Sequence, residues 1–130
     1  MSENEILVGV CGAHMRGLPL NYQLLDLDAK FIKEAKTVKG YRMFELTRKK
    51  PFRPGMFFDG NSEFYVGLEI WSMPIHNFGK FMKLIASPLG IGTIFLEEGE
   101  SVHGFLCEPY YTKGEKEISK YGSWREYKCQ

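Results

Sequence analysis

Residues 6–24, which read ILVGVCGAHMRGLPLNYQL, begin with an apolar run of strand length and then change to a loop between two glycines. A continuous apolar run of this kind is typical of a strand that is buried on both faces. Small residues at the end of such a strand expose backbone N–H groups, which can bind an anion. The loop at residues 12–17 could therefore be an anion-binding site, or its glycines could simply permit a tight turn.

Length and composition indicate a globular protein. We expect residues 1–130 to form one domain, since 130 residues suffice for a core. Hydrophobic residues make up 44% and charged residues 25% of the chain, which is typical of globular proteins. A net charge of +1 provides no excess of cations for nucleic acid. No apolar run approaches the roughly 18 residues of a membrane helix, and no signal peptide is evident, which predicts a cytoplasmic protein without a membrane partner.

The three cysteines, Cys11, Cys107 and Cys129, are widely spaced and include no CxxC pair. This spacing supports neither a disulfide framework nor a zinc site, and we expect no metal or organic cofactor. Cys11 and Cys107 lie within apolar strand patterns. We therefore expect both to be buried thiols.

Hydrophobic periodicity predicts about six strands and two or three helices. Strands are expected at residues 6–11, 41–46, 56–58, 64–71, 93–96 and 101–108. Helices are expected at residues 20–27 and 75–86, and residues 117–127 are expected to form a short helix or an extended tail. Residues 29–39 fit either a strand or a helix.

Turn-forming residues separate these elements. Asp59, Gly60 and Asn61 predict a turn that joins strands 56–58 and 64–71 as a hairpin. Prolines and cations predict a solvated loop at residues 47–55, and a second glycine-rich turn is expected near residues 87–92. This order of elements predicts an α+β fold in which a small, curled, mixed β-sheet packs against the helices.

Long stretches of the sequence resemble the C-terminal domain of allophanate hydrolases over residues 7–127. The motifs that carry this resemblance are GAHMRGLPLNYQL at residues 12–24, YR at 41–42, RPG at 53–55, EIWSMP at 69–74, FGKF at 78–81, PLGIGT at 88–93, VHGFLCEP at 102–109 and GSWREY at 122–127. The resemblance implies a fold similar to that of γ-glutamylcyclotransferases, a small curled barrel with helices around it. In that fold the loop after the first strand holds the substrate.

Two departures from these relatives bear on function. Cyclotransferases carry a glutamate after the helix as acid and base, whereas residues 87–90 here read SPLG and contain no carboxylate. The family domain normally follows an amidase, and these 130 residues have no room for one. We therefore do not expect cyclotransferase activity, and we expect a free-standing copy of the domain.

The resemblance also implies a chemistry. In the family, the amidase half converts allophanate to N-carboxycarbamate, and the C-terminal domain is understood to help decarboxylate that product. This substrate is a small dianion, and the departure of CO₂ leaves negative charge on the bridging nitrogen, which must be protonated. His14 is the candidate general acid, because its ordinary pKa lies near neutrality and an adjacent anion would raise it.

Other residues of the motifs would bind the substrate. We expect the backbone N–H groups of residues 13–15 to form an anion cradle, and Gly90 and Gly92 to let a second backbone segment close over the ligand. Glu69 could orient a partner, or it could be buried and pair with Arg42. The predicted substrate-binding residues are Gly12, Ala13, Met15, Gly17, Asn21, Tyr41, Arg42, Glu69, Gly90 and Gly92.

Two other classes of function stay open. The protein could be a non-catalytic module that docks on a separate amidase through Tyr121, Trp124 and Tyr127, although such an aromatic stripe more often docks onto the protein's own core. The same tail would also allow a homodimer. Alternatively, the protein could be a cyclotransferase-type enzyme that acts on a γ-glutamyl or related amine substrate through another acid and base.

Overall fold

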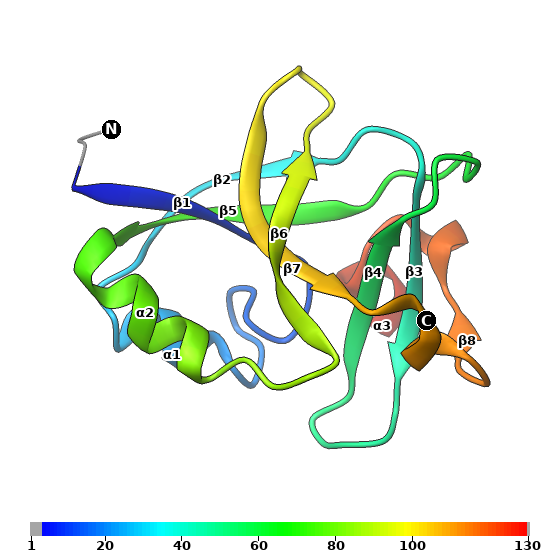
Figure 1. Cartoon of the computed structure of the whole chain (residues 1–130), viewed down its shortest axis with the longest axis horizontal. Coiled ribbons are helices and arrows are strands. Elements are labelled where there is room, and N and C mark those ends of the chain that lie inside the picture. The colour runs from blue at the N-terminus through cyan, green and yellow to red at the C-terminus, as the bar shows by residue number, and fades with distance from the viewer. Residues whose placement is uncertain (1–3, 130) are drawn as a thin grey trace.

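The computed structural model describes residues 4–129, which form eight strands and three α-helices (Figure 1). The strands are β1 (Glu5–Val10), β2 (Lys30–Lys36), β3 (Tyr41–Leu46), β4 (Arg53–Phe58), β5 (Gly67–Pro74), β6 (Leu89–Phe95), β7 (Ser101–Cys107) and β8 (Lys116–Glu117). The helices are α1 (Asn21–Leu25), α2 (Ile75–Lys83) and α3 (Trp124–Lys128), with 3₁₀ turns at Pro109–Thr112 and Ser119–Tyr121. The predicted α+β class is confirmed.

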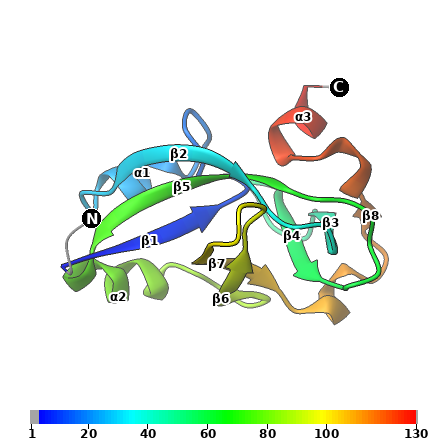
Figure 2. The same cartoon turned by 90° about the horizontal axis from the view of Figure 1, so that it is seen from above.

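The larger sheet has the strand order β2-β5-β1-β7-β6 and is mixed, because β1 runs antiparallel to β5 and parallel to β7. Its two edges meet beyond the ends of β2 and β6. Thr37 bridges Leu96, and the N–H of Val38 donates to the carbonyl of Phe95 at 3.0 Å. The sheet therefore curls into a small barrel, as predicted. Helices α1 and α2 lie at one end of it, and β3, β4 and α3 at the other (Figures 1 and 2).

The smaller sheet has the order β4-β3-β8, and its pairing corrects one prediction. Strand β4 pairs with β3 and not with β5, so the hairpin expected around residues 59–61 is wrong. The N–H groups of Asp59 and Gly60 donate to the carbonyl of Gly40 and hold this turn beside the start of β3. Pro54, expected in a loop, lies within β4, where an edge strand tolerates its missing N–H.

Several element boundaries also differ from those that the hydrophobic periodicity predicts. Residues 29–39, which fit two patterns, contain strand β2, and Phe31 packs edge-on against Trp71 of β5. Strand β6 begins at Leu89, so the glycines expected in a turn lie within a strand. Gly92 lies against Leu106 there: a Cβ at this position would lie 2.6 Å from Cδ1 of Leu106, so that side chain would have to move.

The core confirms the expected buried thiols. Cys11 and Cys107 are both buried and free, and burial raises their pKa values to about 12 and about 11. Trp124 is 3% exposed, and Tyr127 packs on it at 5.7 Å between ring centroids. The aromatic stripe therefore docks onto the protein's own core. No helix within residues 4–129 is long and apolar enough to cross a membrane.

Candidate functional site

The loop after β1 holds its shape through its own backbone. The N–H of Met15 donates to the carbonyl of Gly12 at 3.0 Å, and Asn21 Nδ2, at the start of α1, donates to the carbonyl of His14 at 2.8 Å. The N–H groups of Ala13 and His14 have no acceptor within residues 4–129. Two of the three predicted cradle donors are therefore available, whereas the donor of Met15 is already used.

Gly12 brings this loop against the beginning of β4. A Cβ at Gly12 would lie 2.4 Å from Cδ of Pro54, a distance that no side chain tolerates. The glycine therefore serves close approach between two segments and not only a turn. The other loop glycine, Gly17, has a positive φ of 77° and is exposed, so it serves the turn itself.

His14 lies half-buried where α1, α2 and β7 meet. Its Nε2 is 2.7 Å from Oε1 of Gln23, and its ring contacts Phe81 at 5.4 Å and Phe105 at 5.0 Å between centroids. Because an amide oxygen only accepts, Nε2 carries the proton in the neutral ring. Nδ1 is then the nitrogen left to exchange a proton.

The protein itself shifts the pKa of His14 in the opposite direction to the shift expected from a bound anion. Burial lowers the pKa of His14, the hydrogen bond to Gln23 raises it, and the positive charge of Arg53 lowers it further, with a net decrease from the ordinary value of 6.5. The protein alone therefore favours neutral His14. A negative charge beside the ring would be needed to reverse this.

Glu69 is 2% exposed, and its partners differ from the expected one. Its carboxylate accepts from the N–H of Arg16 at 3.0 Å, from Arg16 Nε at 3.1 Å and from Arg125 at 3.1 Å, not from Arg42. Burial alone would raise the pKa of Glu69, but these bonds and one from Trp71 lower it overall. Glu69 thus ties the loop after β1 to β5 and α3.

The remaining candidates are engaged away from this loop. Tyr41 is fully buried, and its hydroxyl accepts from the N–H of Phe95 at 3.0 Å. Arg42 pairs with Glu117 at 2.8 Å and with Asp59 at 3.4 Å, and the hydrogen bonds that it donates to Glu117 raise its pKa. Gly90 lies in β6 with nothing near its Cβ direction. The structure therefore brings together Gly12, Ala13, His14 and Asn21 but not the β3 and β6 residues.

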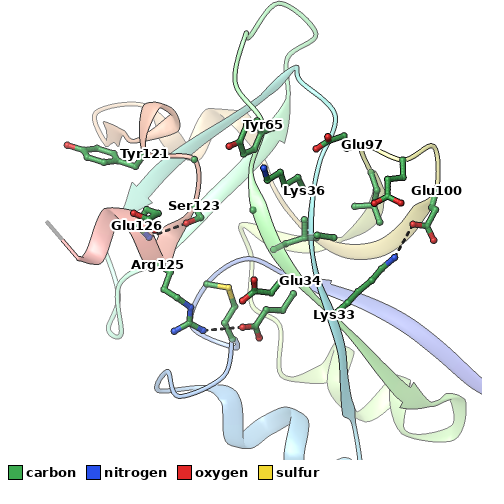
Figure 3. A pocket seen from close by; sticks show the side chains of 18 residues that line it. Lys33, Glu34, Lys36, Tyr65, Glu97, Glu100, Tyr121, Ser123, Arg125 and Glu126 are labelled. Atoms are coloured by element: carbon green, nitrogen blue, oxygen red, sulfur yellow. Dashed lines mark hydrogen bonds and ion pairs between the residues drawn. The ribbon is translucent and has the colours of Figure 1, made fainter.

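A groove of about 590 Å³ is bounded by β2, β5, the β6–β7 turn and α3 (Figure 3). Among the predicted residues, Met15 and Glu69 line it. Arg125 points into the groove from α3, and Lys33 reaches Glu100 across it at 3.2 Å (Figure 3). His14 is not among its lining residues, so the predicted catalytic side chain does not face this groove.

Comparison with known proteins identifies the family. Residues 6–129 match the sequence model of the allophanate hydrolase C-terminal domain. The chain belongs to this family. A urea amidolyase of Lachancea kluyveri is 40% identical over 129 residues, which cover 96% of this chain and 7% of that protein. An allophanate hydrolase structure from Kluyveromyces lactis has a TM-score of 0.92 at 33% identity, over 99% of this chain and 22% of that one.

Smaller proteins share the architecture of the allophanate hydrolase C-terminal domain. A uropathogenic E. coli-specific protein matches with a TM-score of 0.89 at 33% identity, over 100% of this chain and 98% of that chain. A γ-glutamyl cyclotransferase matches with a TM-score of 0.58 at 14% identity, which shows the fold alone. The resemblance seen in the motifs and the implied cyclotransferase-like fold are both confirmed.

Sequence reasoning did not single out several neighbours of the histidine. Gln23, Phe81 and Phe105 contact the His14 ring, and Arg53 acts on it through its charge. All of these residues lie in the motifs shared with the family. Membership in those motifs was the available signal, because no spacing rule links four segments so distant in the chain.

Proposed function

We propose that this domain acts in the breakdown of urea and allophanate by assisting the decarboxylation of N-carboxycarbamate, with His14 as general acid. The names of the relatives, urea amidolyase and allophanate hydrolase, support the pathway. The observation that carries the chemistry is the pair of unbonded N–H groups at Ala13 and His14, next to a histidine ring held by Gln23.

The reaction requires one proton at one atom. The bond between nitrogen and one carboxylate breaks, its electron pair stays on nitrogen, and the products after protonation are CO₂ and carbamate. The N–H groups of Ala13 and His14 stabilise negative charge on the substrate, as oxyanion-binding donors do. His14 supplies the proton from Nδ1, while Gln23 holds Nε2–H and fixes the ring.

The depressed pKa of His14 fits a substrate-dependent acid. Without a neighbouring anion, burial and Arg53 keep the ring neutral near pH 7. A bound dianion favours the imidazolium and raises the pKa of His14. The ring thus becomes charged when the substrate arrives and returns to neutral after the proton transfer.

A coupled assay tests this proposal. Purified amidase is supplied with allophanate, and CO₂ and ammonia are followed with and without this protein. We expect the protein to accelerate CO₂ release and His14→Asn to reduce that acceleration by about 10² to 10⁴, the usual contribution of general acid catalysis. His76→Asn is the matched control, since His76 is an exposed histidine of α2. Unchanged acceleration with folded His14→Asn would contradict the assignment.

A non-catalytic role on an amidase is the second candidate function. It is supported by relatives in which this domain makes up 7% to 22% of the chain. The aromatic stripe of residues 121–127 is not the docking face, because Trp124 is buried in the core. Co-purification with a tagged amidase, together with full coupled activity of His14→Asn, would favour this candidate.

A further inference from the structure

A small cavity near the beginning of β4 is lined by cations. Its volume is about 30 Å³, and its charged lining consists of Arg48, Lys49 and Arg53, with no carboxylate. Residues 86–89, which precede and begin β6, form the opposite wall. A space of this size accommodates about two water-sized atoms, the number of oxygens in one carboxylate.

Arg53 is the half-buried arginine of this cavity without an ion pair among the described residues, whereas Lys49, which also has none, is exposed. The Nε of Arg53 donates to the carbonyl of Pro51 at 3.2 Å, and Arg53 forms no ion pair within residues 4–129. Arg48, by comparison, stacks on the ring of Tyr111 at 4.0 Å and lies 4.0 Å from Glu115. A half-buried guanidinium has a planar fork that suits bidentate binding of a carboxylate.

The cationic cavity and the loop after β1 are neighbours. Pro54 follows Arg53 directly and contacts Gly12, whose missing Cβ permits the close approach. The charge of Arg53 also contributes to the lowered pKa of His14, which places it within electrostatic reach of the ring. Residues 12–15 do not line the cavity itself, but the two free N–H donors and the histidine lie on the segment that packs against Pro54, the residue next to the unpaired guanidinium.

We propose that Arg53 binds one carboxylate of a small dicarboxylate ligand while the N–H groups of Ala13 and His14 bind the other. This assignment rests on the proposed function and names the determinant of its substrate class. A ligand with two carboxylates separated by one atom neutralises both the guanidinium and the backbone donors. A monocarboxylate satisfies only one of them, so the site selects dianions.

Malonate is a stable probe of this assignment, because it carries CH₂ where N-carboxycarbamate carries NH. Malonate and acetate are titrated into ¹⁵N-labelled protein, and the amide signals of Ala13 and His14 are followed. We expect malonate to shift both signals and to bind more tightly than acetate. Arg53→Gln should weaken malonate binding by about 10- to 100-fold, the range for a hydrogen bond to a charged group. The affinity for acetate should change less.

Lys33→Gln is the control, since Lys33 pairs with Glu100 in the other groove and should leave malonate affinity unchanged. If Arg53→Gln binds malonate as the wild type does, the Arg53 assignment is overturned, whereas CO₂ release dependent on His14 would still support the proposed function. If the wild type shows no shift at either amide, the dicarboxylate site is overturned. Should Arg53→Gln not fold, Arg53→Lys decides: weaker malonate binding supports the assignment, and unchanged binding overturns it.

Discussion

The loop after β1, taken with the cationic cavity beside it at the start of β4, differs from the groove over β2 and β5 in size and in the state of its polar groups. The groove is far larger, about 590 Å³ against about 30 Å³ for the cationic cavity. Its cations are already partnered: Lys33 pairs with Glu100, Arg125 with Glu69, and Lys36 lies over the ring of Tyr65. The smaller region keeps an unpaired guanidinium and two unbonded N–H groups.

We therefore base the proposed site on its unsatisfied polar groups and not on cavity volume. A buried or half-buried polar group without a partner costs free energy, and a ligand that supplies the partner recovers it. A ligand in the groove would recover little free energy at the cations, because these cations already have partners. The loop and the start of β4 have two backbone donors and one guanidinium to satisfy.

The largest stability difference between the two regions should come from the same substitution at two glycines. Gly12→Ala places a Cβ 2.4 Å from the ring of Pro54, which cannot rotate away, whereas Gly67→Ala in the groove places it 3.2 Å from Cβ of Ser123. We expect Gly12→Ala to lose about 3 kcal/mol of unfolding free energy, as overpacked sites do, and Gly67→Ala less than about 1 kcal/mol. Urea denaturation measures both, and equal losses would show that the loop is not the tighter region.

Breaking the Glu69 network should have the next largest effect. Glu69→Gln leaves Arg125 without a carboxylate and leaves Arg16 with only its exposed partner Glu34 at 2.9 Å, but both arginines are about half exposed and water compensates in part. We expect a loss of about 2 kcal/mol, within the range for hydrogen bonds to charged groups. Glu100→Gln is the control: its ion pair with Lys33 is exposed, so its loss should stay below about 1 kcal/mol.

The pH dependence of this network distinguishes a charge effect from a packing effect. The pKa of Glu69 is lowered below 4.5 in the folded protein, so its contribution is present above the unfolded pKa and is lost as pH falls through the folded value. The stability difference between wild type and Glu69→Gln should therefore shrink in acid. A difference that stays constant below pH 4.5 would assign the loss to packing.

The motifs were sufficient to predict the family, the fold class and the loop. The first strand, helix α2 after Pro74 and the β6–β7 hairpin all follow from local patterns. Local patterns did not predict which strand pairs with β4. A strand followed by Asp59 and Gly60 has the same local signal whether it pairs with the preceding strand or with the following one. Strand pairing is decided by contacts that are distant in sequence, which periodicity cannot report.

The site was predictable only in part, for the same reason. Residues 12–14 are contiguous, so the sequence placed them together. For Glu69 the sequence left two alternatives, the orientation of a partner or a buried pair with Arg42, and the structure buries Glu69 but pairs it with Arg16 and Arg125. Arg53 was overlooked as a ligand because a cation beside other cations and prolines has the composition of a solvated loop. Its lack of a partner is visible only after folding.

The smallest effect we predict concerns the charge of His14 itself. Its folded pKa is below 6.5, so the unfolded chain takes up a proton that the folded protein does not, and stability should decrease as pH falls below 6.5. In His14→Asn this part of the pH dependence should vanish, unlike the Glu69 effect, which lies in a more acidic range.

NMR titration of the His14 ring measures its pKa directly. Malonate should raise the His14 pKa, because an anion favours the imidazolium, and its affinity should increase as pH falls through that raised pKa, within the range in which malonate stays a dianion. A His14 pKa that malonate leaves unchanged would separate the histidine from the anion site and leave only the N–H groups and Arg53 to bind the ligand.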